Sequence, residues 1–171
     1  MEGSGLREVG WPALEPRTGE IDFGVAVVRL RIRTREPVEV VDLTSRVEAF
    51  LAAARLEAGW VNVQSRHTTA GIAVNENEPL LLQDLLALLE RLAPRGDGYA
   101  HDELHRRVGV PPDERPNGHA HAKALLLRTA ETLNVSGGRL QLGRWQRILL
   151  VELDGPRDRE VSLLALGEKR Q

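Results

Sequence analysis

The sequence has 171 residues, the usual size of one domain, and 42% of them are apolar, as is typical of globular proteins. With 23 basic and 25 acidic residues and no basic run, the chain lacks the charge excess of a nucleic-acid-binding protein, so no nucleic-acid partner is expected. The absence of cysteine excludes disulfides, iron–sulfur clusters and a cysteine nucleophile, so any transition-metal site has to use histidine or carboxylate ligands.

Targeting and membrane signals are missing from the sequence. Residues 1–10 lack the pattern of a signal peptide, and no apolar run approaches the roughly 20 residues that span a bilayer. We therefore expect a cytoplasmic protein without a membrane partner. Residues 1–17, which are rich in glycine and proline, are expected to form an irregular lead-in, and residues 18–171 to form a single domain.

The first half of the chain predicts three strands and one helix. Alternating apolar residues over 21–33 predict a long strand. A helix is expected over 44–58, with Gly59 as its C-terminal cap. Alternation returns over 60–65, and a further short strand is expected at 72–74.

The second half begins with a leucine-rich helix over 78–92, whose first turn tolerates a proline. A long, proline-rich connection follows over 94–117, and Asn117 can cap another helix that extends to about Leu133. Strands are expected between 139 and 166. Since the strands come mostly in runs, the pattern favours an α+β domain with a sandwich of mostly antiparallel sheets and helices packed on it, over a doubly wound parallel fold.

Histidines are confined to the middle of the chain. Neutral imidazole is the commonest zinc ligand and the usual group for proton transfer near neutral pH, although surface or structural roles are the simpler alternative. The segment from His101 to His105 is similar to the His-Glu-x-x-His helix of zinc proteases, but Asp102 replaces the glutamate, and we do not expect a protease. The five histidines are His67, His101, His105, His119 and His121.

The segment His67-Thr68-Thr69-Ala70-Gly71 lies between two predicted strands. Polar residues at the end of a strand, followed by small residues, suit a close approach of ligand to backbone. The hydroxyls of Thr68 and Thr69 and the free amides nearby could bind a phosphate or a carboxylate. An ordinary turn with a polar tip is the alternative.

Three other segments carry groups that could act on a ligand. Within Asn75-Glu76-Asn77-Glu78, Glu76 could accept a proton or bind a cation, or it could complement the dipole of the helix that follows. Trp145 could stack on an aromatic ligand, and Arg157 could bind phosphate. A core tryptophan and an arginine of a turn are the corresponding alternatives.

Five blocks of sequence occur in a recognisable order. They are HTTAGIAVNENEP at 67–79, Tyr99-x-His101-Asp102, Asn117 through Ala120-His121-x-Lys123, Gly138-x-Leu140-x-Leu142-Gly143-x-Trp145-Gln146-x-Ile148, and DGPR at 154–157. Over roughly residues 18–167, the chain resembles the YjbQ family, a group of small proteins described as secondary thiamine-phosphate synthases. The connection from His101 to His121 is longer than we expect in that family, and Arg144 stands where a threonine is usual.

The resemblance implies an α+β domain, a homotrimer and a metal-binding or catalytic cluster formed by His67, His101 and His121. Three imidazoles with an open fourth position would suit a catalytic zinc ion, and Mg²⁺ would be possible if pyrophosphate is handled. We expect Asn75, Thr68 and Thr69 to belong to the substrate-binding set.

The activity implied by the resemblance is the transfer of a pyrimidine diphosphate to a thiazole phosphate with release of pyrophosphate, which could be a side activity. Arg157, the threonines and a cation would bind the phosphates, and Trp145 would hold a ring. One alternative is a metal-dependent hydrolase of a small phosphorylated or carboxylated metabolite, with Glu76 as the base. The other is a non-catalytic oligomer that binds a small anion.

Overall fold

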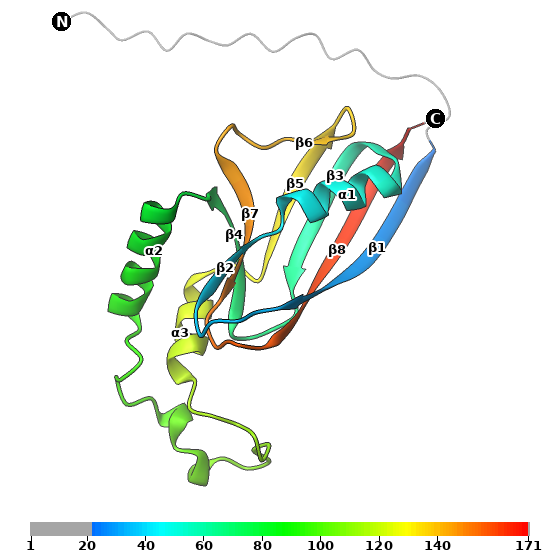
Figure 1. Ribbon diagram of the computed structural model, residues 1–171. Coiled ribbons are helices and arrows are strands. Elements are labelled where there is room, and N and C mark those ends of the chain that lie inside the picture. The colour runs from blue at the N-terminus through cyan, green and yellow to red at the C-terminus, as the bar shows by residue number, and fades with distance from the viewer. Residues whose placement is uncertain (1–21, 171) are drawn as a thin grey trace, which may run out of the picture.

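Two antiparallel sheets and three α-helices make up the computed structural model, which describes residues 22–170 (Figure 1). The predicted lead-in, residues 1–17, lies outside the described residues. In chain order the elements are β1 (Phe23–Arg33), β2 (Glu39–Asp42), α1 (Thr44–Ala54), β3 (Leu56–Ser65), β4 (Ala70–Glu76), α2 (Pro79–Leu92), the 3₁₀-helices η1 (Ala100–Asp102) and η2 (Leu104–Arg106), α3 (Gly118–Leu126), β5 (Ala130–Ser136), β6 (Arg139–Leu140), β7 (Gln146–Glu152) and β8 (Asp158–Lys169).

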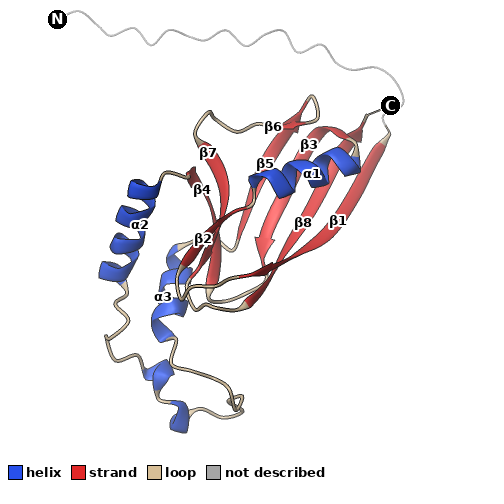
Figure 2. Ribbon diagram, viewed as in Figure 1, coloured by secondary structure: helices blue, strands red, loops and turns tan. Residues whose placement is uncertain are grey.

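The larger sheet has the strand order β1-β8-β3-β5-β6, and the smaller sheet has the order β2-β7-β4. The helix α1 lies across the larger sheet, whereas α2 and α3 lie beyond the smaller one (Figure 2). All pairings between these strands are antiparallel, so the predicted α+β class is confirmed. Among residues 22–170, no helix has both the length and the apolar character that crossing a membrane requires.

The main core fills the space between the two sheets and α1. Along β8 every second residue is buried, which is the period expected of a strand with one face against a core. The buried residues of this core come from both sheets and from α1. They include Val47, Leu51, Val61, Val63, Ile72, Ile148, Leu150, Val161 and Leu163.

The end of α1 differs from the prediction. The helix ends at Ala54, followed by Arg55 in the left-handed conformation with φ of 52°, and not at Ala58. Gly59 lies inside β3 opposite Gly167, and both have a positive φ. A Cβ on Gly59 would stand 2.2 Å from the Leu166 carbonyl oxygen, so this glycine permits a close approach of two strands and does not cap a helix.

The predicted helix from Asn117 to about Leu133 was wrong in its second half. The helix α3 ends at Leu126, and β5 then pairs with β3 from Ala130 to Ser136. Val135 is buried in the main core, so pairing with a long strand prevails over local helical periodicity here. The sequence analysis also missed β2, a strand of four residues that pairs with β7.

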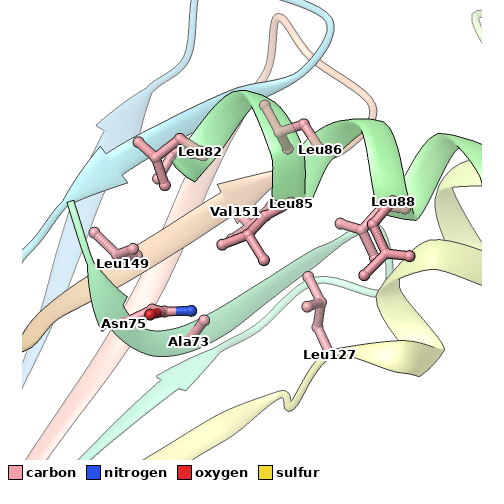
Figure 3. A pocket seen from close by; sticks show the side chains of 11 residues that line it. Ala73, Asn75, Leu82, Leu85, Leu86, Leu88, Leu127, Leu149 and Val151 are labelled. Carbon is pink, nitrogen blue, oxygen red and sulfur yellow. The ribbon is translucent and has the colours of Figure 1, made fainter. Parts of the chain in front are cut away.

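The leucine-rich helix α2 begins and ends as predicted. The carboxylate of Glu78 caps it by accepting hydrogen bonds from the amides of Leu80 and Leu81, at 2.9 and 2.7 Å. No residue of α2 is buried. Figure 3 shows leucines of α2 facing Ala73 and Leu149 of the smaller sheet across an apolar cavity of about 200 Å³.

Candidate functional site

An open cavity of about 530 Å³ lies at one end of the larger sheet. Three connections line it: the turn between β3 and β4, the long connection from η1 to α3, and the turn between β7 and β8. Six of the nine predicted site residues line this cavity, namely His67, Thr68, Thr69, His101, His121 and Arg157. We call it the histidine cavity.

The other three predicted residues lie elsewhere in the chain. Glu76 and Trp145 line a separate hollow beside Pro79, and Asn75 lines the apolar cavity under α2. The reason is the length of β4: six residues at about 3.3 Å each separate Ala70 from Glu76, so Glu76 lies at the opposite end of the strand. Trp145 is 59% exposed, and the Arg144 guanidinium lies 4.8 Å from the centre of its ring.

His67 is held by a backbone amide. The Glu160 N–H donates a hydrogen bond to Nε2 of His67 at 2.7 Å. Because that nitrogen accepts, the neutral ring carries its proton on Nδ1. Burial lowers the pKa of His67, and the nearby Arg159 charge lowers it further. His67 is therefore a neutral imidazole with one N–H left to donate.

His101 and His121 form a pair. Their ring centres are 4.6 Å apart, and the ring planes meet at 66°, an edge-to-face arrangement. Burial lowers the pKa of His121, and His101 lowers it further, whereas Asp154 and Glu114 act in the opposite direction. At neutral pH, His121 is thus a proton acceptor.

The pairing of these imidazoles depends on how η1 docks on α3. A carboxylate oxygen of Asp102 accepts a hydrogen bond from the Gly118 amide at 2.7 Å. A Cβ on Gly118 would lie only 2.4 Å from Cβ of Tyr99, so the absence of a side chain there allows the close contact. Asp102 and Gly118 therefore bring His101 against His121.

Buried ion pairs support the wall of the histidine cavity. Glu152 and Arg159 are both almost fully buried, and Arg159 Nε donates to Glu152 Oε2 at 2.5 Å. The same guanidinium donates to the hydroxyl of Thr69 at 2.9 Å. Thr69 is itself buried, so it anchors the turn, while Thr68 is exposed at the cavity.

Asp154 organises the opposite wall. Its buried carboxylate accepts hydrogen bonds from Arg115 Nε at 3.1 Å, Arg157 Nε at 2.9 Å and Asn117 Nδ2 at 3.0 Å. These donors hold its pKa below the usual value despite burial. Glu152 and Asp154 were not among the predicted site residues, although an acid at the end of the apolar run Ile148–Val151 was a usable signal.

The three imidazoles do not fit a ready metal centre as they lie. Among residues 22–170, no group of three histidine, aspartate or glutamate side chains could hold a metal ion. Nε2 of His67 already accepts the Glu160 amide, and ligation through it would break that bond.

The two remaining histidines lie outside the histidine cavity. His105 is exposed on η2. His119 is buried on α3, and burial, followed by the Lys123 charge, lowers its pKa. Since His119 and His121 are two residues apart on a helix, their side chains point to different sides, and only His121 lines the cavity.

Comparisons with known proteins agree with this architecture. The family described as UPF0047 protein YjbQ-like matches residues 28–168. A UPF0047 protein of Archaeoglobus fulgidus is 40% identical over 81% of this chain and all of its own length. The UPF0047 protein YugU of Bacillus subtilis is 35% identical over 81% of this chain and 97% of its own length.

Solved structures give the same result. A YbjQ-like protein of unknown function from Sulfolobus solfataricus superposes with a TM-score of 0.77 and 31% identity, covering 85% of this chain and 99% of its own. A hypothetical protein from Aeropyrum pernix superposes with a TM-score of 0.75 and 37% identity, covering 84% of this chain and 99% of its own. The chain belongs to the UPF0047 family of YjbQ-like proteins.

Proposed function

We propose that the chain is an enzyme that binds a small phosphorylated or carboxylated metabolite in the histidine cavity and transfers a group from it. One observation carries the proposal: His67, His101 and His121, from three separate elements, line one open cavity together with Arg107. Imidazoles that are neutral near pH 7 can move protons during the reaction, and a guanidinium can hold an anion.

The cavity residues divide into two sets of roles. Nδ1–H of His67 and the guanidinium of Arg107 are donors for phosphate or carboxylate oxygens. Of the described residues, no carboxylate forms an ion pair with Arg107, which donates only to the His101 carbonyl at 3.3 Å. His121 is the proton acceptor, because burial lowers its pKa and keeps it neutral.

The specific reaction proposed is the transfer that the family resemblance implies: a pyrimidine diphosphate joins a thiazole phosphate, and pyrophosphate leaves. Donors fixed around a cavity support such a reaction, because they stabilise the charge on the leaving group. Trp145 does not line this cavity, so the imidazoles of His101 and His121 are the rings of the cavity lining against which a ligand ring could pack.

The experiment is an assay of the purified protein with both precursors, with no metal, with Mg²⁺ and with Zn²⁺. We expect thiamine phosphate and pyrophosphate to appear in equal amounts. His121→Ala should lower kcat about 100-fold or more, as is usual for loss of an acid–base group. His105→Ala is the matched control, since His105 is an exposed histidine outside the cavity. No product under any metal condition would reject this transferase reaction.

A metal-dependent hydrolase remains a separate proposal from the sequence. It would require His67 to exchange the Glu160 amide for a metal ion. Stoichiometric zinc in the purified protein, lost in His67→Ala, would support it. Full activity of the metal-free protein would reject it.

A non-catalytic anion-binding oligomer is the third proposal. It would retain its ligand without turnover, so consumption of any metabolite would exclude it.

A further inference from the structure

Two opposite charges line the histidine cavity without pairing with each other. Arg107 and Glu114 both come from the connection between η1 and α3 and are half-buried. No ion pair within 4.0 Å joins Arg107 to Glu114, and neither has another charged partner among the residues that the structure describes. Each of the other arginine and carboxylate side chains that line the cavity has such a partner, for example Arg157 with Asp154.

Both charges lie near the same imidazole. Glu114 and Arg107 both act electrostatically on His121, with opposite effects on its pKa, and all three side chains line the same cavity. A ligand that reaches His121 would therefore meet both charges.

Asn117 orients the carboxylate of Glu114. Its Nδ2 donates to Glu114 Oε1 at 3.2 Å and to Asp154 Oδ2 at 3.0 Å, so a flipped amide would place an oxygen against two carboxylates. This fixes Oδ1 on the other side, where it has no hydrogen-bond partner. Asn117 is 4% exposed and lines the cavity, so this wall holds one buried acceptor, Asn117 Oδ1, that lacks a donor.

Building on the proposed function, we infer that the metabolite is zwitterionic: its phosphate or carboxylate binds Arg107, and an amino group at its other end binds Glu114, which Asn117 holds in place. A plain alkyl phosphate would leave Glu114 without a cation, and a plain amine would leave Arg107 without an anion. The substrate class is thus a small aminated phosphate ester or amino acid. This inference keeps the anion site and the group transfer of the proposed function and replaces the pyrimidine and thiazole phosphates as its substrates.

The experiment uses three phosphate esters of nearly equal size: O-phosphoethanolamine, 2-hydroxyethyl phosphate and propyl phosphate. Their affinities are measured by calorimetry at neutral pH, where the amine is charged. The wild-type protein should bind O-phosphoethanolamine about tenfold more tightly than propyl phosphate, with the hydroxyl compound between them. This comparison needs no variant, so it does not depend on how a mutant folds.

Variants then assign the preference to individual side chains. Glu114→Gln keeps the acceptor for Asn117 and should remove the preference for the amine without weakening the binding of propyl phosphate, because loss of a negative charge cannot disfavour an anion. Arg107→Gln should weaken all three esters by a similar factor and preserve their order. The matched control is Asp113→Asn, which removes a charge just outside the cavity lining. It should change neither the preference for the amine nor the affinity for the esters.

The outcomes separate this inference from the proposed function. Equal binding of the amine and propyl esters by the wild-type protein overturns the inference and leaves the anion site standing. A preference for the amine that persists in Glu114→Gln also overturns it. If no ester binds, and inorganic phosphate does not bind either, the proposed function and the inference both fail.

Discussion

At the cavity, the imidazole of His67 accepts a hydrogen bond from the Glu160 amide, and a ring that does so keeps its own proton on Nδ1. Protonation of Nε2 would place its N–H against the N–H of Glu160, so the hydrogen bond would be lost. Burial and the Arg159 charge act in the same direction on the pKa. A single backbone contact therefore makes this imidazole a neutral donor, a role that its position in the sequence does not specify.

This contact predicts how His67 titrates. Its NMR titration midpoint should lie below the value of about 6.5 of a free imidazole. The folded state then binds fewer protons than the unfolded state between the two pKa values, so the contribution of His67 to stability is complete above pH 6.5 and falls as the pH falls through that window. Urea unfolding at several pH values should show that the free energy of unfolding depends less on pH in His67→Gln than in the wild-type protein. A midpoint above 6.5 would contradict the prediction.

The pair of Glu152 and Arg159 gives a second prediction at this scale. Glu152→Gln would leave the buried Arg159 charge uncompensated and should lower the free energy of unfolding by about 3–5 kcal/mol. The matched control is Asp158→Asn, which breaks the exposed pair with Arg33 and should change stability little. Equilibrium unfolding in urea measures both, and equal effects of the two substitutions would refute the assigned role of the buried pair.

Among the elements, those whose signals are local were predictable and those that depend on distant pairing were not. The helix α2 has a proline in its first turn, a capping glutamate and a leucine repeat, and the prediction of 78–92 is close to the observed helix. The strand β5 was missed because its stability comes from pairing with β3, which lies about 70 residues earlier.

The same distinction applies to the candidate site. The family resemblance pointed to His67, His101 and His121, and the structure places all three in one cavity. Glu76 lines a different hollow because β4 carries the chain away from the cavity, and Trp145 lies in that hollow because it precedes Gln146, which pairs with Glu76. Closeness in sequence is thus a poor guide to closeness in space when a strand separates two residues.

The contact between η1 and α3 predicts that a substitution at Gly118 weakens ligand binding more than it lowers the stability of the fold. Gly118→Ala would force a Cβ to within 2.4 Å of Tyr99 and should push η1 away from α3, which separates His101 from His121. Because this contact lies outside the main core, phosphate-ester binding should fall at least tenfold while most of the stability remains. Gly96→Ala, with no atom within 4 Å of the added Cβ, should change neither property. Unchanged binding in Gly118→Ala would argue against this docking role.

At the scale of the whole molecule, α2 carries apolar surface that lies outside the main core. The helix α2 carries eight leucines, yet none of its residues is buried, and Leu80 and Leu92 are 67% and 61% exposed. The exposed leucines are Leu80, Leu88 and Leu92, which are spaced by multiples of four and so share one helix face, and an exposed apolar face of this kind marks an interaction site. We propose that α2 packs against a neighbouring copy, in agreement with the homotrimer that the family resemblance implies.

Leu80→Glu tests this proposal without weakening the helix. An acid in the first turn complements the helix dipole, so any loss of assembly comes from the lost apolar contact, which is worth about 1.5–3 kcal/mol for each leucine. Light scattering coupled to size-exclusion chromatography should find the wild-type protein at three times the chain mass and the variant shifted toward the monomer. Gln83→Glu adds the same charge to the first turns of α2 without removing a leucine and should remain trimeric. A wild-type protein that stays monomeric at all concentrations would refute the proposal, because the leucines of α2 would then face solvent in solution.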